Sequence, residues 1–149
     1  MADTATRRMR VLFLCTHNSS RSQMAEGLLR ALGGERHETF SAGTQARGIH
    51  SLAIRVMAEH GIDISEAAGH RSKSLQEFQG QPMDLVVTVC DEAAEECPLF
   101  PGARRQEHWS FRDPSAATGT EEQQLAVFRQ VRDAIEARVK QFLQLGQQG

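Results

Sequence analysis

The 149-residue sequence lacks an excess of charge of either sign, and it has few aromatic residues. Lys and Arg number 17 against 19 Asp and Glu, which gives a net charge of −2, and aromatic residues make up 5% of the chain. Nucleic-acid binders usually carry a basic patch or stripe, so this composition argues against that class of protein. Any anion that the chain binds is expected to be small and held locally.

The sequence also lacks an apolar run long enough to span a bilayer, and MADTATRRMR leads into a short apolar run without a signal-peptide core. We therefore expect a cytoplasmic protein with no membrane partner. Three cysteines, an odd number, suit a reducing compartment better than a disulfide scaffold. The C-x2-C and H-x3-H spacings of a structural zinc site are missing, so we expect no metal and no other cofactor.

Apolar, strand-like runs alternate with runs of helical periodicity along the chain. Strands are predicted at 9–15, 37–43 and 83–90, with a weaker candidate at 104–111, and helices at 22–33, 50–60, 73–79 and 121–144. This order predicts an α/β fold, a three-layer sandwich with a four-stranded parallel sheet and right-handed crossovers. The length matches one domain over residues 1–149, which we expect to be a monomer, with GQQG as a loose tail.

Three reactive groups follow predicted strands. Cys15 ends the first strand, Cys90 ends the third, and Asp113 comes a few residues after the fourth. In open parallel sheets, binding sites form beyond the carboxyl ends of the strands. We therefore expect these side chains to share one edge of the sheet and to form the active site.

The stretch CTHNSSRS, residues 15–22, has the composition of an anion-binding loop. A helix that begins near Ser22 would direct its unpaired N–H groups at a tetrahedral oxyanion, and Arg21 would bind two oxygens of that ion. The same field would stabilise a Cys15 thiolate, the nucleophilic form, with hydroxyl hydrogen bonds from Ser20 and Ser22. Asn18 tolerates the left-handed conformation that a tight loop needs. The predicted oxyanion-binding residues are Thr16, His17, Asn18, Ser19, Ser20, Arg21 and Ser22.

Asp113 is a candidate general acid. Expelling hydroxide from a bound oxyanion requires a proton, and a carboxylic acid that faces the site can supply it. Asp-Pro pairs are also common in turns without chemistry, so a purely structural role for Asp113 before Pro114 stays open.

The segment CTHNSSRSQMAEG resembles the oxyanion loop of the low-molecular-weight phosphotyrosine phosphatase superfamily, and RSQMAEG is more similar to the arsenate reductases built on that fold. The resemblance continues in FSAG at 40–43, DLVVTVCDEAAEECP at 84–98, EHWSFRDP at 107–114 and FRQVRDAI at 128–135. It implies a phosphatase-like fold in which Cys15 is the nucleophile, Arg21 clamps the anion and Asp113 donates a proton.

Within this superfamily, the other cysteines separate two activities. A protein-tyrosine or small phosphoester phosphatase needs only Cys15, Arg21 and Asp113. The acidic stretch DEAAEE between Cys90 and Cys97 does not suit a buried core cysteine, and the absence of tyrosine weakens the case for a phosphotyrosine-binding site. We therefore favour arsenate reduction, while the phosphatase and a non-enzymatic oxyanion or redox sensor remain alternatives.

The resemblance to the reductases implies a thiol relay. Cys15 attacks arsenate, Cys90 then attacks Cys15 and releases arsenite, and Cys97 moves the disulfide to the Cys90–Cys97 pair. Thioredoxin or glutaredoxin would reduce that pair. Phosphate and sulfate would compete with arsenate for the loop.

Some of these reductases hold a potassium ion beside the loop with an Asn, a Glu, a Ser and an acidic residue. Asn18, Glu26 and Ser41 match the first three positions, whereas the fourth aligns with Lys73 in HRSKSL. An ammonium group there would neutralise Glu26 and bind Asn18 and Ser41 in place of the ion. A solvated Lys73 is the alternative.

Overall fold

The computed structural model describes residues 8–91 and 100–148. Its sheet consists of four parallel strands in the order β2-β1-β3-β4, which confirms the predicted α/β class and parallel sheet; the predicted third layer contains only a short 3-10 turn and loops among the described residues. The strands are β1 (Met9–Cys15), β2 (His37–Gly43), β3 (Met83–Thr88) and β4 (Ala103–His108). The helices are α2 (Arg21–Gly33), α3 (Ser51–Ala58) and α4 (Glu121–Gln148).

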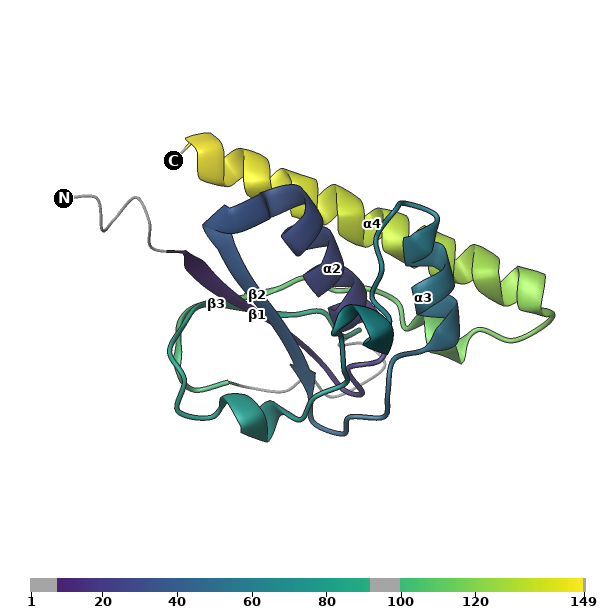
Figure 1. Ribbon diagram of the computed structural model, residues 1–149, viewed down its shortest axis with the longest axis horizontal. Helices are drawn as coiled ribbons and strands as arrows, with labels where there is room; N and C mark the ends of the chain where they lie inside the picture. The colour runs from purple at the N-terminus through teal and green to yellow at the C-terminus, as the bar shows by residue number, and fades with distance from the viewer. Residues whose placement is uncertain (1–7, 92–99, 149) are drawn as a thin grey trace.

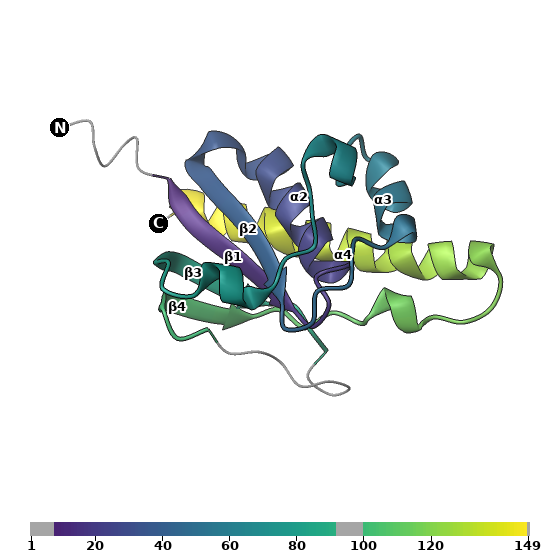
Figure 2. The ribbon, with the colours of Figure 1, turned by 60° about the horizontal axis from the view of Figure 1, so that its bottom comes forward.

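All three α-helices pack on one face of the sheet, with the long helix α4 running past both α2 and α3 (Figures 1 and 2). Val11, Phe13 and Cys15 of β1 point into this helical layer, while Leu12 and Leu14 point to the opposite face. Because β1 is buried on both faces, its sequence is a continuous apolar run without alternation.

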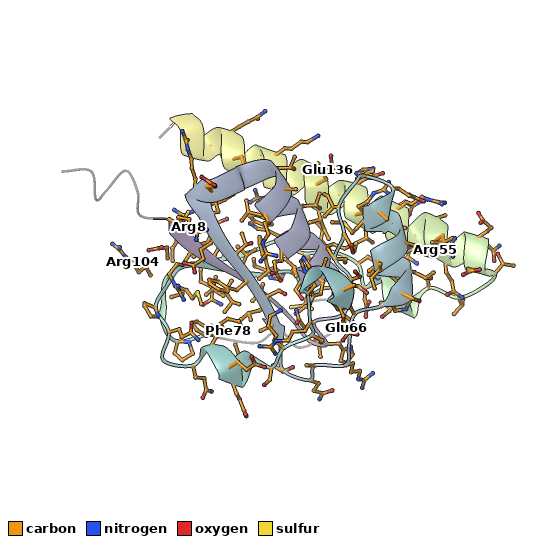
Figure 3. The ribbon with its side chains drawn as sticks, viewed as in Figure 1. Arg8, Arg55, Glu66, Phe78, Arg104 and Glu136 are labelled. Carbon is orange, nitrogen blue, oxygen red and sulfur yellow. The ribbon has the colours of Figure 1, made fainter. Side chains whose placement is uncertain are left out.

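The second face of the sheet is covered by a short 3-10 turn, η3 (Leu75–Phe78), and by loops. Phe78 and Phe100 pack there against apolar side chains of β1 and β3. Figure 3 shows Phe78 on the side away from the helices, whereas charged residues such as Arg55 and Glu136 lie on the outer surface of the helical layer. Among the described residues, no helix combines the length and apolar character needed to cross a membrane.

The strand register fixes which residues meet at the carboxyl edge. Cys15 pairs with Gly43 of β2, and the preceding residue of β1, Leu14, pairs with Thr88 of β3. The Val89 amide still donates to Leu14 O at 2.9 Å, so the backbone stays paired up to the residue before Cys90. The cysteine-bearing ends of β1 and β3 therefore lie side by side, as predicted.

Several predicted boundaries differ from the structure. The third strand ends at Thr88 rather than at 90, and the helix predicted at 50–60 is α3 at Ser51–Ala58. The helix expected at 73–79 is only the 3-10 turn η3, because Gln79 is already extended and Gly80 follows with a φ of 83°. The fourth strand ends at His108 rather than at 111, since the chain then leaves the sheet toward the oxyanion loop. The expected tail is wrong as well, because α4 continues to Gln148.

Candidate active site

The oxyanion loop, residues 15–21, turns its backbone carbonyl groups outward. Four successive carbonyl oxygens accept hydrogen bonds from neighbouring segments of the chain. The pairs are Gln45 N to Thr16 O at 2.8 Å, Arg47 N and Ser72 Oγ to His17 O at 3.1 Å each, Ser72 Oγ to Asn18 O at 3.0 Å, and His50 N to Ser19 O at 2.9 Å. With these oxygens directed outward, the loop amides are the backbone groups left to face an anion at its centre.

Asn18 sits at the bend of this loop. It has a φ of 50° and is fully buried, so the predicted left-handed conformation is present. Its side-chain oxygen accepts from Lys73 N at 2.7 Å and from Gln23 Nε2 at 2.9 Å. These bonds hold a conformation that costs a non-glycine residue energy.

Ser22 contacts the sulfur of Cys15. Ser22 Oγ lies 2.8 Å from Cys15 Sγ and accepts from Asn18 Nδ2, also at 2.8 Å. Since the amide nitrogen of Asn18 can only donate, the Ser22 hydroxyl is left to donate its own proton to the sulfur. The nucleophile of the predicted reaction, Cys15, is 2% exposed and has a hydroxyl donor beside its sulfur.

The predicted contact between Ser20 and Cys15 is wrong. Ser20 Oγ and Thr16 Oγ1 are both buried and have no hydrogen-bond partner among the described residues. Buried hydroxyls are normally paired, so two unpaired ones in an anion-binding loop are candidates to contact the ligand. Ser22 thus contacts the sulfur of Cys15, whereas Ser20 is available to bind an oxyanion.

Arg21 and Asp113 face each other across the site. The Arg21 side chain is 3% exposed, and its guanidinium donates to Phe111 O at 3.2 Å and lies 3.7 Å from Asp113 Oδ2. The other oxygen of Asp113 accepts from the backbone N and the hydroxyl of Ser115, at 3.0 and 2.7 Å. One oxygen of Asp113 therefore caps the turn and the other faces Arg21, while its role as general acid stays a prediction.

His50 adjoins the loop, and the sequence reasoning missed it. Its ring packs on Phe128 with centroids 4.7 Å apart, and its Nδ1 accepts from Leu52 N. Burial lowers the pKa of His50, although the negative charge of Asp113 partly opposes this shift. The ring is therefore neutral at pH 7, with its proton on Nε2 because Nδ1 is an acceptor. The sequence signal for His50 was its position as a polar residue directly before a helical run, where an N-cap residue is expected.

The second predicted redox residue, Cys90, lies two residues beyond the end of β3 and is fully buried. It is disulfide-bonded, whereas Cys15 is free. Cys97, the third cysteine of the predicted relay, lies outside the described residues.

The cluster beside the loop does not fit a potassium ion. The Glu26 carboxylate accepts from Ser41 Oγ and from Arg30, and Lys73 Nζ lies 3.8 Å from it. Lys73 therefore neutralises Glu26, as expected, but its ammonium group donates to Arg71 O at 2.7 Å. The expected ammonium contacts with Asn18 and Ser41 are wrong, since Asn18 is bound by the Lys73 backbone instead.

Gly43 allows the loop to lie against β2. A Cβ at this position would come within 2.5 Å of Thr16 O and 2.8 Å of Asn18 N. Only glycine leaves room for this approach. The resemblance included Gly43 within FSAG, but the reason for it, a backbone contact with the loop, emerges only from the structure.

Comparison with known proteins gives consistent matches. Residues 10–148 match the family described as Low molecular weight phosphotyrosine protein phosphatase. The arsenate reductase of Halalkalibacterium halodurans is 46% identical over 136 residues, which cover 91% of this chain and 96% of that protein.

Solved structures agree in fold. An arsenate reductase in the phosphate binding state superposes with a TM-score of 0.76 at 34% identity, covering 91% of this chain and 96% of that one. A thioredoxin-dependent arsenate reductase of Corynebacterium glutamicum has a TM-score of 0.66 at 26% identity, covering 97% of this chain and 66% of that one.

Proposed function

Because the chain belongs to the low molecular weight phosphotyrosine protein phosphatase family, with an arsenate reductase as a relative over 91% of its length, we propose that it reduces arsenate to arsenite. The observation that supports this most is the adjacency of two strand ends. Cys15 lies in the oxyanion loop at the end of β1, and Cys90 follows the end of β3, the strand paired with β1. A phosphatase would need only the first of these cysteines.

In the first step, arsenate binds to the loop amides and to Arg21, and the Cys15 thiolate attacks arsenic. A sulfur–arsenic bond forms while an arsenic–oxygen bond breaks, and the departing hydroxide takes a proton from Asp113 to leave as water. Ser22 holds the thiolate through its hydroxyl, which lies 2.8 Å from Sγ.

In the second step, Cys90, whose disulfide the dithiol reductant must first open, attacks Cys15 Sγ as a thiolate. A sulfur–sulfur bond forms, the sulfur–arsenic bond breaks, and its electron pair stays on arsenic, which leaves as arsenite. Cys97 then attacks Cys90, which frees the Cys15 thiolate and leaves a Cys90–Cys97 disulfide. A dithiol reductant, thioredoxin or glutaredoxin, reduces this disulfide by exchange. Phosphate and sulfate compete for the loop.

We further propose that the chain acts as a monomeric single domain in the cytoplasm. A relay that ends in exchange with a protein dithiol needs a reducing compartment. The described structure provides one sheet with one layer of α-helices, and the loop, Arg21 and Asp113 all come from the same chain.

The test is an assay of NADPH oxidation with arsenate, thioredoxin and thioredoxin reductase. NADPH consumption should depend on arsenate and on the protein, and replacement of Cys15 or Cys90 by serine should abolish it. A parallel assay with p-nitrophenyl phosphate gives the comparison. Hydrolysis that survives Cys90→Ser, together with no arsenate-dependent NADPH consumption, would identify a phosphatase and overturn the proposal.

A further inference from the structure

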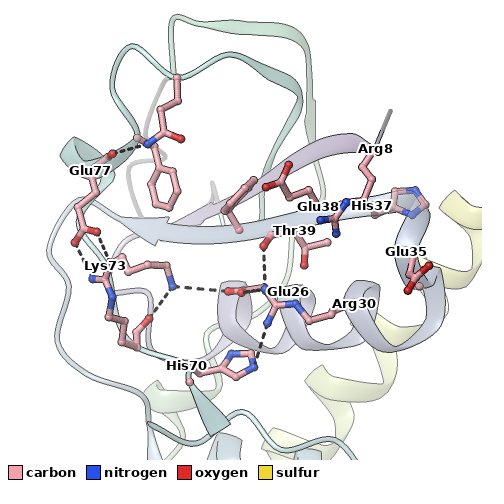
Figure 4. A pocket seen from close by; sticks show the side chains of 16 residues that line it. Arg8, Glu26, Arg30, Glu35, His37, Glu38, Thr39, His70, Lys73 and Glu77 are labelled. Atoms are coloured by element: carbon pink, nitrogen blue, oxygen red, sulfur yellow. Dashed lines mark hydrogen bonds and ion pairs between the residues drawn. The ribbon is translucent and has the colours of Figure 1, made fainter. Parts of the chain in front are cut away.

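A cavity of about 710 Å³ lies beside the edge strand β2 (Figure 4). Its walls come from α2, from β2 and from the segment that leads to η3, with Arg30, Thr39, His70 and Lys73 among the lining residues. None of its described lining residues belongs to the oxyanion loop. The cavity is therefore separate from the proposed arsenate site.

Charged side chains gather at one end of this cavity. Glu26, 5% exposed, is the buried anion, and two cations, Arg30 and Lys73, face it. The neighbouring Arg71 and Glu77 neutralise each other through two hydrogen bonds of 2.9 and 2.6 Å. Two cations therefore surround the single buried carboxylate of this cluster, while the exposed Asp63 adds a negative charge near His70.

His70 adds a hydrogen-bond donor without a partner. Its Nε2 lies 3.4 Å from Arg30 Nη1, and a guanidinium can only donate, so Nε2 is the acceptor. Burial lowers the pKa of His70, so the ring is neutral at pH 7 and carries its proton on Nδ1. That Nδ1 is buried, and it has no hydrogen-bond partner among the described residues. Figure 4 shows the ring below the Lys73–Glu26 pair.

Thr39 provides a second unpaired group. Its side chain is 5% exposed, and its Oγ1 is buried with no hydrogen-bond partner in the described part of the chain. The carbonyl of the same residue accepts from Arg30 Nη2 at 2.9 Å, which places Thr39 next to the cation cluster. An unpaired buried hydroxyl costs stability unless something binds to it.

We propose that this end of the cavity is a second anion site, which takes a tetrahedral oxyanion such as sulfate or inorganic phosphate. The anion would accept hydrogen bonds from His70 Nδ1 and Thr39 Oγ1, with Arg30 and Lys73 as counter-charges. The donors come from α2, from β2 and from the 70–73 segment, so they surround a ligand from several sides. This suits a tetrahedral acceptor better than a planar carboxylate.

The test is an NMR titration with sodium sulfate at constant ionic strength, carried out in an Arg21→Ala background so that the oxyanion loop is weakened. The backbone amide resonances of Thr39 and His70 should shift and saturate at millimolar sulfate. Phosphate should give the same pattern, and acetate should not saturate it. If acetate binds as tightly as sulfate, the assignment to tetrahedral oxyanions is wrong.

Two variants and one control identify the residues responsible. Arg30→Gln removes a charged donor and should lower the affinity for sulfate at least about tenfold. Thr39→Val removes a neutral hydroxyl and should lower this affinity about fivefold. Arg55→Gln removes the same charge from α3, where Arg55 pairs with Glu121 at 2.8 Å, and should change the affinity less than about twofold.

Thr39→Val decides the question if Arg30→Gln does not fold, since it keeps the shape and every charge of the cluster. Shifts confined to residues 15–22, shifts that do not saturate, or equal affinities in Thr39→Val and its parent would overturn the proposal.

Discussion

Replacement of Ser22 by alanine should make Cys15 a poorer nucleophile. The Ser22 hydroxyl lies 2.8 Å from Cys15 Sγ and 2.8 Å from the Asn18 amide nitrogen, so Ser22→Ala removes a donor from the sulfur. A hydrogen bond to a charged group contributes about 1.5–3 kcal/mol, so its loss alone should slow attack by the sulfur about 10- to 100-fold. The thiolate that remains is more basic and more reactive, which offsets about half of this loss on a logarithmic scale.

The assay is the alkylation rate of Cys15 by iodoacetamide, followed by peptide mass spectrometry at the acid end of a pH series. Ser22→Ala should react about 3- to 10-fold more slowly than wild type, given the size of the lost hydrogen bond and the partial offset. Ser20→Ala is the matched control, because Ser20 Oγ has no hydrogen-bond partner among the described residues. Equal rates in Ser22→Ala and wild type, or an equal slowing in Ser20→Ala, would refute this account of the thiolate.

Three further changes test the loop, the acid and a surface network. Gly43→Ala should destabilise the fold by about 1–3 kcal/mol and weaken phosphate binding, because the added Cβ would lie 2.5 Å from a loop carbonyl oxygen. Asp113→Asn should slow arsenate reduction about 100-fold with phosphate affinity nearly unchanged, because the amide keeps the shape but cannot donate the carboxyl proton. Hydrogen bonds from Arg129 and Arg132 lower the pKa of Glu59 to about 2, so Glu59→Gln should lower the melting temperature at pH 7.

The readouts are chemical unfolding and phosphate titration for Gly43→Ala, turnover and phosphate titration for Asp113→Asn, and melting curves across pH for Glu59→Gln. A depressed carboxyl pKa stabilises the fold above its unfolded value, and this contribution disappears as pH falls through the folded value. The difference in melting temperature between Glu59→Gln and wild type should therefore disappear as the pH falls from 4.5 to about 2. A melting-temperature difference that does not depend on pH would contradict the role given to Glu59. An unchanged rate in Asp113→Asn would contradict the general acid, and a Gly43→Ala protein as stable as wild type would contradict the close contact between Gly43 and the loop.

Elements with a strong hydrophobic pattern could be predicted from the sequence. The apolar run Met9–Cys15 is a strand buried on both faces, and its boundaries agree with the prediction. The segment at 73–79 has weaker determinants: Phe78 is the only buried residue of η3, and too few apolar contacts hold it for a full helix to form. The length of such an element depends on tertiary packing, which a local pattern does not contain.

The chemistry of the loop could be predicted better than its hydrogen bonds. Cys15, Arg21 and Asn18 are recognisable from residue type and spacing, but the choice between Ser20 and Ser22 as the partner of the sulfur depends on backbone angles within the turn. The pairing of Glu26 with Arg30 follows helical i,i+4 spacing and was available from the sequence. The contact of Lys73 with Asn18 could not be predicted from the sequence, because it uses the backbone of a segment 55 residues away.

The most direct test of the proposed relay is the product of a single turnover by Cys97→Ser. This variant keeps Cys15 and Cys90 but lacks the thiol that moves the disulfide onward. After reaction of the reduced protein with excess arsenate, about one arsenite per protein should form, and peptide mass spectrometry should find a Cys15–Cys90 disulfide. Sustained turnover at the wild-type rate when thioredoxin, thioredoxin reductase and NADPH are added, or one equivalent of arsenite formed without them while Cys15 and Cys90 both stay reduced, would contradict the relay.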